Sequence, residues 1–196
     1  SKNEIKNVFK NYFIEFNIFL DQLNLIEKNI KKVAFIPLSP NSLNLKYDKN
    51  IEDLFIRFNV NILKKFRKNC TDNIAIFMNL HPLDLYSEEN KNNKYSEFVS
   101  NFVNKLQEES FEVYVVSDYL DSQYKSEIIY EMVELFLNPN YFVCSYLSAS
   151  LITSQLSIRN KFLIELNDNF LVKMVPSLNK YKKLNENMNS FFTTIY

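Results

Sequence analysis

Short runs of apolar residues alternate along the chain with longer segments in which apolar residues recur every three or four positions. The short runs are rich in β-branched and aromatic residues and end at polar residues or proline, a pattern typical of buried strands. They cover residues 31–37, 73–82, 111–116, 141–144 and 161–165. Each of these runs is predicted to form a strand.

The segments between these runs have the period of an amphipathic helix. They cover residues 4–29, 51–68, 95–109 and 126–137. Strands that alternate with helices predict a parallel sheet with helices on both faces. The expected fold class is α/β: a Rossmann-like three-layer domain with a mostly parallel sheet of about five strands, preceded by an amphipathic helix.

The length of 196 residues suits one domain. We expect residues 1–30 to form the leading amphipathic helix, residues 31–170 the Rossmann-like domain and residues 171–196 an extension that packs on it. The leading helix is rich in aromatic residues. It either packs on its own domain or forms the junction to a second domain, a subunit or a second copy of the chain.

Glycine is absent from the chain, although average usage would give about fourteen. Its absence excludes P-loops, the glycine-rich dinucleotide fingerprint, the G-x-S-x-G nucleophile elbow and the kinase glycine loop. Each of these motifs needs backbone geometry that only glycine permits. Asparagine tolerates positive φ better than other residues with a Cβ atom, so we expect it at turns and helix ends.

Charge and hydropathy limit the partners. Lys and Arg number 23 and Asp and Glu number 23, so no net charge attracts nucleic acid or an anionic membrane. The basic segment 64–68 is interpreted as the end of a helix, where positive charge opposes the helix dipole. The chain has no apolar run of membrane-spanning length and no signal-peptide core, which predicts a soluble intracellular protein. Cys70 and Cys144 are expected to be free thiols.

Polar residues follow the predicted strands. His81, the only histidine, closes the run 73–82, and residues 39–42, Ser117 with Asp118, and the serines of 145–150 follow three other strands. In a parallel sheet these positions share the carboxyl edge, where open α/β sheets bind ligands. They contain no carboxylate pair at fixed spacing and no second histidine for a zinc site, so no metal is expected.

A phosphate is the natural ligand for this set of residues. Hydroxyls and backbone N–H groups at a helix amino terminus favour an anion. His81 can donate to a phosphate oxygen or protonate a leaving group, because the unperturbed pKa of histidine is about 6.5. Two alternatives stay open: Ser145, Ser148 and Ser150 can cap the helix, and His81 can be a loop residue that bonds its neighbours.

A strand that ends in His81-Pro82, followed by helix, strand, helix and a strand that runs into Ser148-Ala149-Ser150, resembles the carboxyl-terminal domain of GT-B glycosyltransferases of the bacterial sialyltransferase, polysialyltransferase and capsule-polysaccharide type. The segment 35–38 resembles the strand that opens the nucleotide-binding half of the capsule enzymes. The resemblance covers roughly residues 33–165.

The resemblance implies a transferase for cell-surface glycans that uses a nucleotide-activated sugar, most often CMP-linked, such as CMP-sialic acid. It implies that His81 is catalytic, that Ser148, Ser150 and Ser145 bind the donor phosphate, and that no metal or further cofactor is needed. It further implies a glycan acceptor and a cytoplasmic protein, with peripheral attachment to the inner membrane face as a variant. Candidate donor contacts are Ser39, Asn41, Pro82, Ser117, Asp118 and Glu165.

The sequence also departs from this family. The general base of the family lies in an acidic motif followed by glycine in an amino-terminal domain, and this chain has neither that domain nor any glycine. A basic residue often precedes the His-Pro pair in the family, whereas Leu80 precedes it here, and Ala149 splits the serine pair. Two other functions stay open. One is a non-catalytic α/β module that binds a partner through its leading helix. The other is a hydrolase or transferase that acts on a nucleotide or nucleoside, which needs Asp84, Asp118 or Glu165 close to His81.

Overall fold

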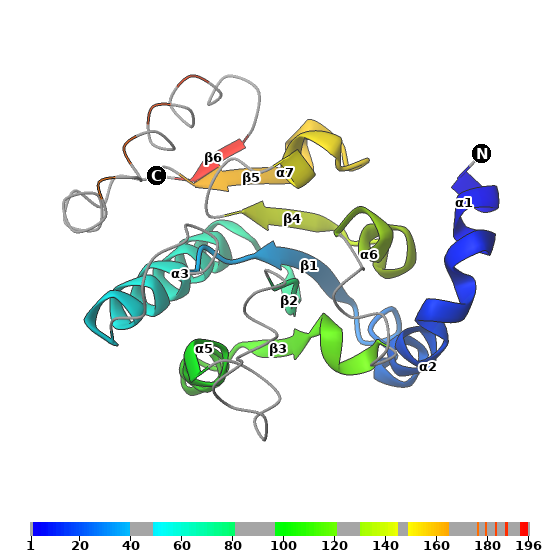
Figure 1. Ribbon diagram of the computed structural model, residues 1–196, viewed down its shortest axis with the longest axis horizontal. Coiled ribbons are helices and arrows are strands. Elements are labelled where there is room, and N and C mark those ends of the chain that lie inside the picture. The colour runs from blue at the N-terminus through cyan, green and yellow to red at the C-terminus, as the bar shows by residue number, and fades with distance from the viewer. Residues whose placement is uncertain are drawn as a thin grey trace.

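The computed structural model describes residues 2–39, 49–80, 97–120, 130–144, 149–164 and 193–195, together with the single residues 176, 179, 183 and 187. Its centre is a parallel sheet with the strand order β3-β2-β1-β4-β5-β6 (Figure 1). The strands are β1 (Ile30–Ile36), β2 (Asn73–Met78), β3 (Glu112–Val115), β4 (Tyr141–Cys144), β5 (Lys161–Ile164) and β6 (Thr193–Ile195). The predicted α/β class and the five predicted strands are confirmed, whereas β6 was not predicted.

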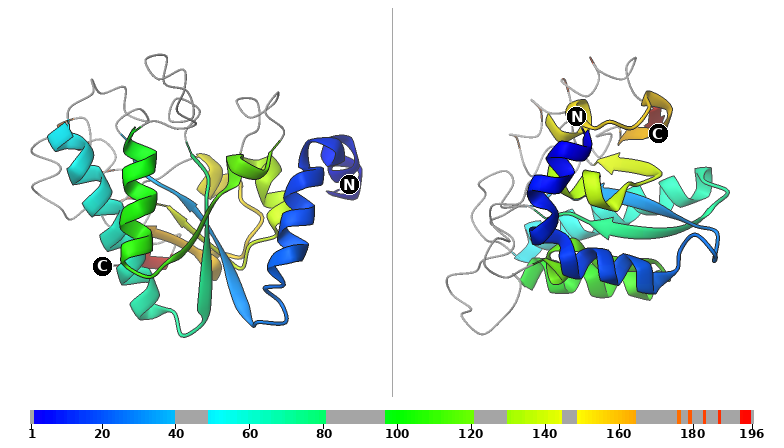
Figure 2. Two further views of the ribbon diagram at one scale, coloured as in Figure 1. Left: turned by 90° about the horizontal axis from the view of Figure 1, so that it is seen from below. Right: turned by 90° about the vertical axis from the view of Figure 1, so that its right-hand side faces the viewer.

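Helices cover both faces of the sheet, as Figure 2 shows. The α-helices are α1 (Lys2–Phe9), α2 (Ile14–Leu23), α3 (Lys49–Asn69), α5 (Glu97–Glu108), α6 (Tyr130–Leu137) and α7 (Ala149–Thr153), and the 3-10 helices are η1 (Lys10–Phe13), η3 (Val116–Tyr119) and η4 (Ile158–Asn160). Helices α3 and α5 pack on one face, while α2, α6 and α7 pack on the other. The alternation along β1 produces this division, because Val33 and Phe35 enter one core and Ala34 enters the other.

The leading amphipathic helix is present, but η1 divides it into α1 and α2, which meet at a bend in Figure 1. At the bend, Phe13 is fully buried and stacks on Phe136 of α6, with ring centroids 4.1 Å apart. Burial of this ring outweighs the small loss of regular helix geometry. The helix ends at Leu23 because Asn24 takes a left-handed conformation with φ 51°, and its N–H bonds the carbonyl of Asp21.

Asparagine takes the positions that glycine holds in other proteins, as predicted. Among the described residues, positive φ occurs at Asn24, Asn29, Asn138 and Ser110. All four lie where a helix or turn leads into the next strand of the sheet. The short polar side chains of these residues reduce the cost of a left-handed backbone.

The predicted basic helix end is also present at the end of α3. Lys64 forms an ion pair with Glu109 at 2.9 Å, and Arg67 donates from Nη1 to the carbonyl of Glu109 at 3.0 Å. The guanidinium of Arg67 lies 4.0 Å from the ring centre of Phe111. These contacts join the end of α3 to the turn before β3, which accounts for the basic residues structurally.

Within the described ranges, no helix combines the length and the apolar character that crossing a membrane requires. Cys70 and Cys144 are both free thiols, as predicted, and Cys144 is buried.

Candidate functional site

At the centre of the sheet, the carboxyl ends of β1, β2 and β4 lie side by side. In the strand register, Ile36 of β1 pairs with Cys144 of β4, and Phe35 pairs with Met78 of β2. Beyond β1 the chain continues to α3 on one face, and beyond β4 it continues to α7 on the other. The gap between β1 and β4 is therefore the point where the direction of the strand order reverses, which is the usual ligand position in open α/β sheets.

A buried asparagine holds the chain as it leaves β1. Asn59, in the middle of α3 and fully buried, accepts a hydrogen bond from the N–H of Leu38 at 3.0 Å and donates to the carbonyl of Leu38 at 2.7 Å. Its amide also donates to the carbonyl of Phe55 at 2.8 Å. We call this arrangement the Asn59 clamp. It fixes the backbone beside Ser39, which is also fully buried.

Asn59 is not among the site residues predicted from the sequence. The signal was present, because Asn59 lies among Phe55, Ile62 and Phe66 in the apolar stripe of α3, where an unpartnered amide would be costly. A polar residue in the apolar stripe of a helix therefore indicated a buried hydrogen-bonding role.

The chain that leads to His81 is fixed up to the preceding residue. The N–H of Asn79 donates to the carbonyl of Phe35 at 2.9 Å, which extends the pairing of β2 with β1 by one bond, and Leu80 is buried. His81 and Pro82 themselves lie outside the described residues, as does Asp84. The structure therefore shows the point from which His81 departs, one strand away from the gap between β1 and β4.

Ser117 and Asp118 lie further from that gap. Both belong to η3, which follows β3, and β2 separates β3 from β1. Ser117 is buried, and the neighbouring Tyr119 stacks on Phe19 of α2 with ring centroids 3.5 Å apart. With strands about 4.8 Å apart, the end of β3 is roughly 10 Å from that of β1. These two residues are thus placed under α2 and not beside Ser39.

Beyond β4 the structure describes one of the predicted phosphate ligands. Ser150 is partly buried in α7, and its carbonyl accepts from the N–H of Ser154 at 2.9 Å. Helix α7 runs only from Ala149 to Thr153, so the dipole that it contributes is small. The other predicted ligands on this side lie outside the described residues: Ser145, Ser148 and Glu165, together with Asn41 in the connection after β1.

A buried carboxylate occupies the start of α3. Glu52 lies in the first turn of α3 and is 1% exposed. Its Oε1 accepts from the amide of Asn101 on α5 at 3.0 Å, and its Oε2 has no hydrogen-bond partner among the described residues. In dinucleotide-binding folds the helix after the first strand receives the pyrophosphate at this position. A buried acidic residue there disfavours such a ligand.

A second buried polar cluster joins α6 to the amino end of β5. Glu134 of α6 accepts at Oε1 from the hydroxyl of Ser154 at 2.9 Å and from the N–H of Gln155 at 2.9 Å. Lys161, the first residue of β5, donates from Nζ to the carbonyl of Ser154 at 2.6 Å. Burial lowers the pKa of the Lys161 ammonium, and the negative charge of Glu134 opposes this shift. The cluster fixes the path between α7 and β5.

Groups of histidine, cysteine, aspartate and glutamate able to hold a metal ion do not occur in the described ranges. Comparisons of the chain with family models, with curated proteins and with solved structures found no match. Function must therefore be argued from the fold and from the residues at the edge of its sheet.

Proposed function

We propose that this chain is the donor-binding half of a glycosyltransferase that uses a CMP-linked, nucleotide-activated sugar. The observation that carries the proposal is the parallel strand order β3-β2-β1-β4-β5-β6. This is the strand order of the Rossmann fold, which is built from two mononucleotide-binding halves, and in that fold the ligand crevice lies over the carboxyl ends of the strands where the order reverses, here β1 and β4. Ser39 follows β1 at that crevice, and the serine-rich segment that contains Ser150 follows β4.

The proposed chemistry is stabilisation of a leaving nucleotide. As the glycosidic bond breaks, negative charge develops on the donor phosphate, and donors fixed at that place lower the barrier. His81 would donate a hydrogen bond or a proton to this phosphate, and the hydroxyls of Ser148 and Ser150 would donate hydrogen bonds. Because the Asn59 clamp fixes the backbone after β1, it would hold one wall of the crevice in place.

The position of Glu52 argues for a phosphate site after β4 and against one at the start of α3. Its buried carboxylate lies in the first turn of the helix that follows β1, and the chain has no glycine with which to bring backbone close to a pyrophosphate. A dinucleotide bound in the usual way at α3 is therefore disfavoured. The segment after β4 is the position at which the family that this chain resembles carries its serine pair.

A thermal-shift titration with CMP, CDP, UDP and GDP tests the proposal. A ligand that binds only the folded state stabilises it by about 2.7 kcal/mol at a hundredfold excess over its dissociation constant. We expect one nucleotide to raise the melting temperature, and we expect His81→Ala and the double variant Ser148→Ala/Ser150→Ala to abolish the shift. Ser157→Ala, an exposed serine beyond α7, is the matched control and should keep the full shift.

If none of the four nucleotides shifts the melting temperature, the donor site is not autonomous and the proposal fails for this chain. A shift that survives in both site variants would place nucleotide binding elsewhere and would equally reject the assigned residues.

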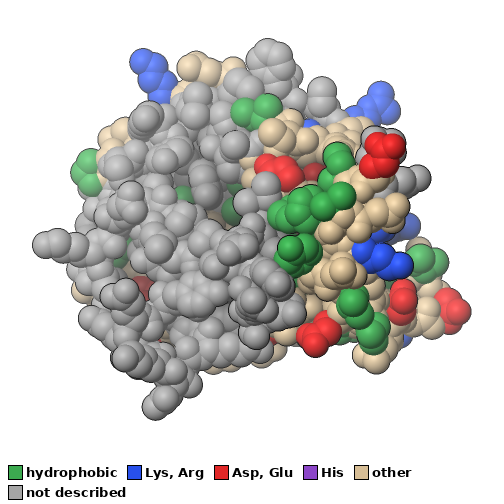
Figure 3. Space-filling model, turned by 45° about the vertical axis from the view of Figure 1, so that its right-hand side comes forward, with side chains coloured by type: hydrophobic (Ala, Val, Ile, Leu, Met, Phe, Trp, Pro, Cys, Tyr) green, Lys and Arg blue, Asp and Glu red, His purple; other side chains and the backbone are tan. Residues whose placement is uncertain are grey.

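One observation bears on the alternative of a non-catalytic interaction module. Ile5, Val8, Ile14 and Ile18 are all at least 50% exposed along α1 and α2. Figure 3 shows separate hydrophobic patches on this side of the molecule. Sedimentation velocity over a range of concentrations, together with the nucleotide titration, separates the two functions. Self-association without any nucleotide response favours the module.

A further inference from the structure

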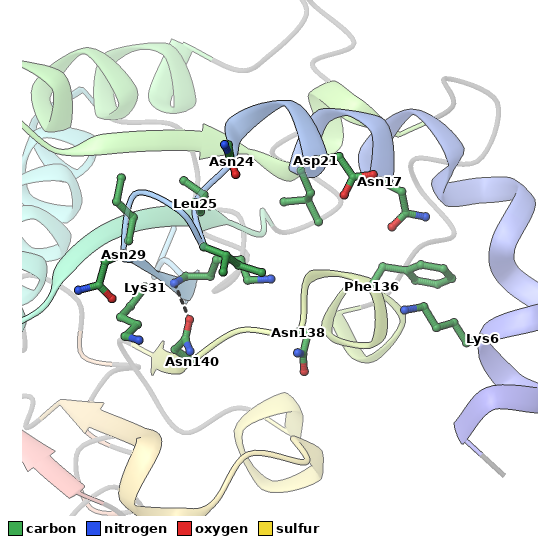
Figure 4. A pocket seen from close by; sticks show the side chains of 14 residues that line it. Lys6, Asn17, Asp21, Asn24, Leu25, Asn29, Lys31, Phe136, Asn138 and Asn140 are labelled. Carbon is green, nitrogen blue, oxygen red and sulfur yellow. Dashed lines mark hydrogen bonds between the residues drawn. The ribbon is translucent and has the colours of Figure 1, made fainter.

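A cavity of about 590 Å³ lies at the amino edge of the sheet, opposite the carboxyl edge that carries the proposed donor site. It is open to solvent on one side and is lined by residues of α1, α2, the turn after α2, the start of β1 and the end of α6 (Figure 4). Protein sites for small molecules have volumes of roughly 300 to 1,000 Å³, so this cavity is large enough for one.

The cavity has an excess of positive charge. Lys6 from α1 and Lys31 and Lys32 from β1 line it, whereas Asp21 is the one acidic residue among its described lining residues. In the part of the chain that the structure describes, the ion pairs join Lys64 to Glu109 and Lys105 to Glu108. None of these pairs neutralises a lysine of the cavity.

Lys32 is the most constrained of the three lysines. Its Nζ donates to the carbonyl of Leu137 at the end of α6, and its backbone exchanges two hydrogen bonds with Asn140, at 2.9 and 2.8 Å. An ammonium group carries three N–H donors, so two remain for a ligand. Burial and the positive charge of Lys6 both lower the pKa of Lys32. A bound anion would offset both effects.

The other lining groups suit a ligand that also carries neutral polar groups. In Figure 4, Asn17 and Asp21 reach into the cavity from α2, and Lys6 extends from α1 toward Phe136. The Nζ of Lys6 lies 5.2 Å from the ring centre of Phe136, which limits the range of positions open to its ammonium. Asn138 contributes a carboxamide from the end of α6. Carboxamides both donate and accept hydrogen bonds, as hydroxyl and carbonyl groups require.

We propose that this cavity binds a small organic polyanion, whose phosphate or carboxylate groups contact Lys6 and Lys32 while Lys31 contributes from the rim. The site is separate from the proposed donor site, because it lies at the opposite edge of the sheet and shares no residue with it. The chain would then bind two ligands. Lysines hold the polyanion in the cavity, whereas hydroxyls and an imidazole hold the nucleotide sugar in the proposed donor site.

Isothermal titration calorimetry with pyrophosphate and with citrate tests this proposal in low-salt buffer. We expect at least one of the two anions to bind, with an affinity that falls as salt is added. Charge-assisted hydrogen bonds are the strong ones, so Lys6→Gln and Lys32→Gln should each weaken binding by about tenfold or more. Lys28→Gln removes the same charge at an exposed position outside the lining and should change the dissociation constant less than about twofold.

Asp21→Asn gives a change of opposite sign. Removal of the one carboxylate among the described lining residues should strengthen binding several-fold, an effect that general destabilisation of the fold would not produce. This variant and Lys6→Gln keep the test decisive if Lys32→Gln folds poorly. The proposal is overturned if neither anion binds at millimolar concentration, if Lys6→Gln binds as tightly as the native chain, or if Asp21→Asn weakens binding.

Discussion

The two edges of the sheet are built differently. At the amino edge, helices and turns lead into strands through short connections, such as 24–29 before β1, 70–72 before β2 and 138–140 before β4. At the carboxyl edge, residues 37–48 separate β1 from α3, whereas residues 145–148 alone separate β4 from α7. Short connections are set by local backbone chemistry, whereas long ones carry the residues that differ between functions.

The same contrast appears in how each edge is held. Side chains tie the amino edge at several points, through Lys32 on Leu137, Arg67 on Glu109 and Lys161 on Ser154. At the carboxyl edge, the described anchor of the β1 connection is Asn59. Loss of a single residue should therefore have its largest effect at the carboxyl edge.

The largest effect is expected for Asn59→Ala. The substitution leaves the N–H and the carbonyl of Leu38 buried without their partner, and each unsatisfied group costs about 1 to 3 kcal/mol. We expect urea denaturation to show a loss of about 3 kcal/mol in the free energy of unfolding. Asn61→Ala, at an exposed position on the same helix, is the matched control and should stay within about 0.5 kcal/mol. Equal losses in the two variants would contradict the clamp.

A smaller loss is expected at the amino edge for Glu134→Ala. This change removes the acceptor of two hydrogen bonds, from Ser154 and Gln155, and leaves the buried ammonium of Lys161 without its neighbouring negative charge. Denaturation at pH 7 should show a loss of about 2 kcal/mol. The control is the double variant Glu134→Ala/Lys161→Met.

That double variant should lose less stability than the sum of the two single variants, because it removes both of the charges that interact. Strict additivity would mean that Glu134 and Lys161 do not interact.

The smallest effect is expected for the surface pair of Lys64 and Glu109. The hydrogen bond from Lys64 lowers the pKa of Glu109, so the pair stabilises the fold above the unfolded pKa of the carboxyl. That contribution is lost as the pH falls through the lowered pKa of the folded state. Lys64→Gln should raise the pKa of Glu109, measured by NMR titration of its carboxyl carbon, and leave the melting temperature at pH 7 almost unchanged. Lys65→Gln, an exposed neighbour, should leave this pKa where it is.

The fold could be predicted from the sequence because its signals are local. The β-branched run of β1 and the period of α3 need no knowledge of distant residues, and the absence of glycine indicated asparagine at positions such as Asn24 and Asn138. The division of the leading helix at Phe13 could not be predicted, because it depends on a ring of α6 more than a hundred residues away.

The site was less predictable than the fold. The sequence predicted that His81, Ser117 and Asp118 share one edge of the sheet. It did not predict the strand order, in which β2 lies between the end of β3 and that of β1. It also missed Glu52 and Asn59, because a polar residue in a helical stripe does not reveal its partner on another element. The cavity at the amino edge combines five separate segments, and no sequence pattern marks such a combination.

The central position of β1 has a consequence for the timing of folding. Its two neighbours come from later parts of the chain, since Ile30 pairs with Asn73 on one side and Ile36 pairs with Cys144 on the other. A nascent chain that has left the ribosome only as far as β3 still exposes one long side of β1, a central strand of the sheet. Contacts between such distant segments slow folding, and unpaired strand edges invite association with other chains. Synthesis of this protein therefore includes an interval, which closes when β4 emerges, in which the first half depends on protection from aggregation.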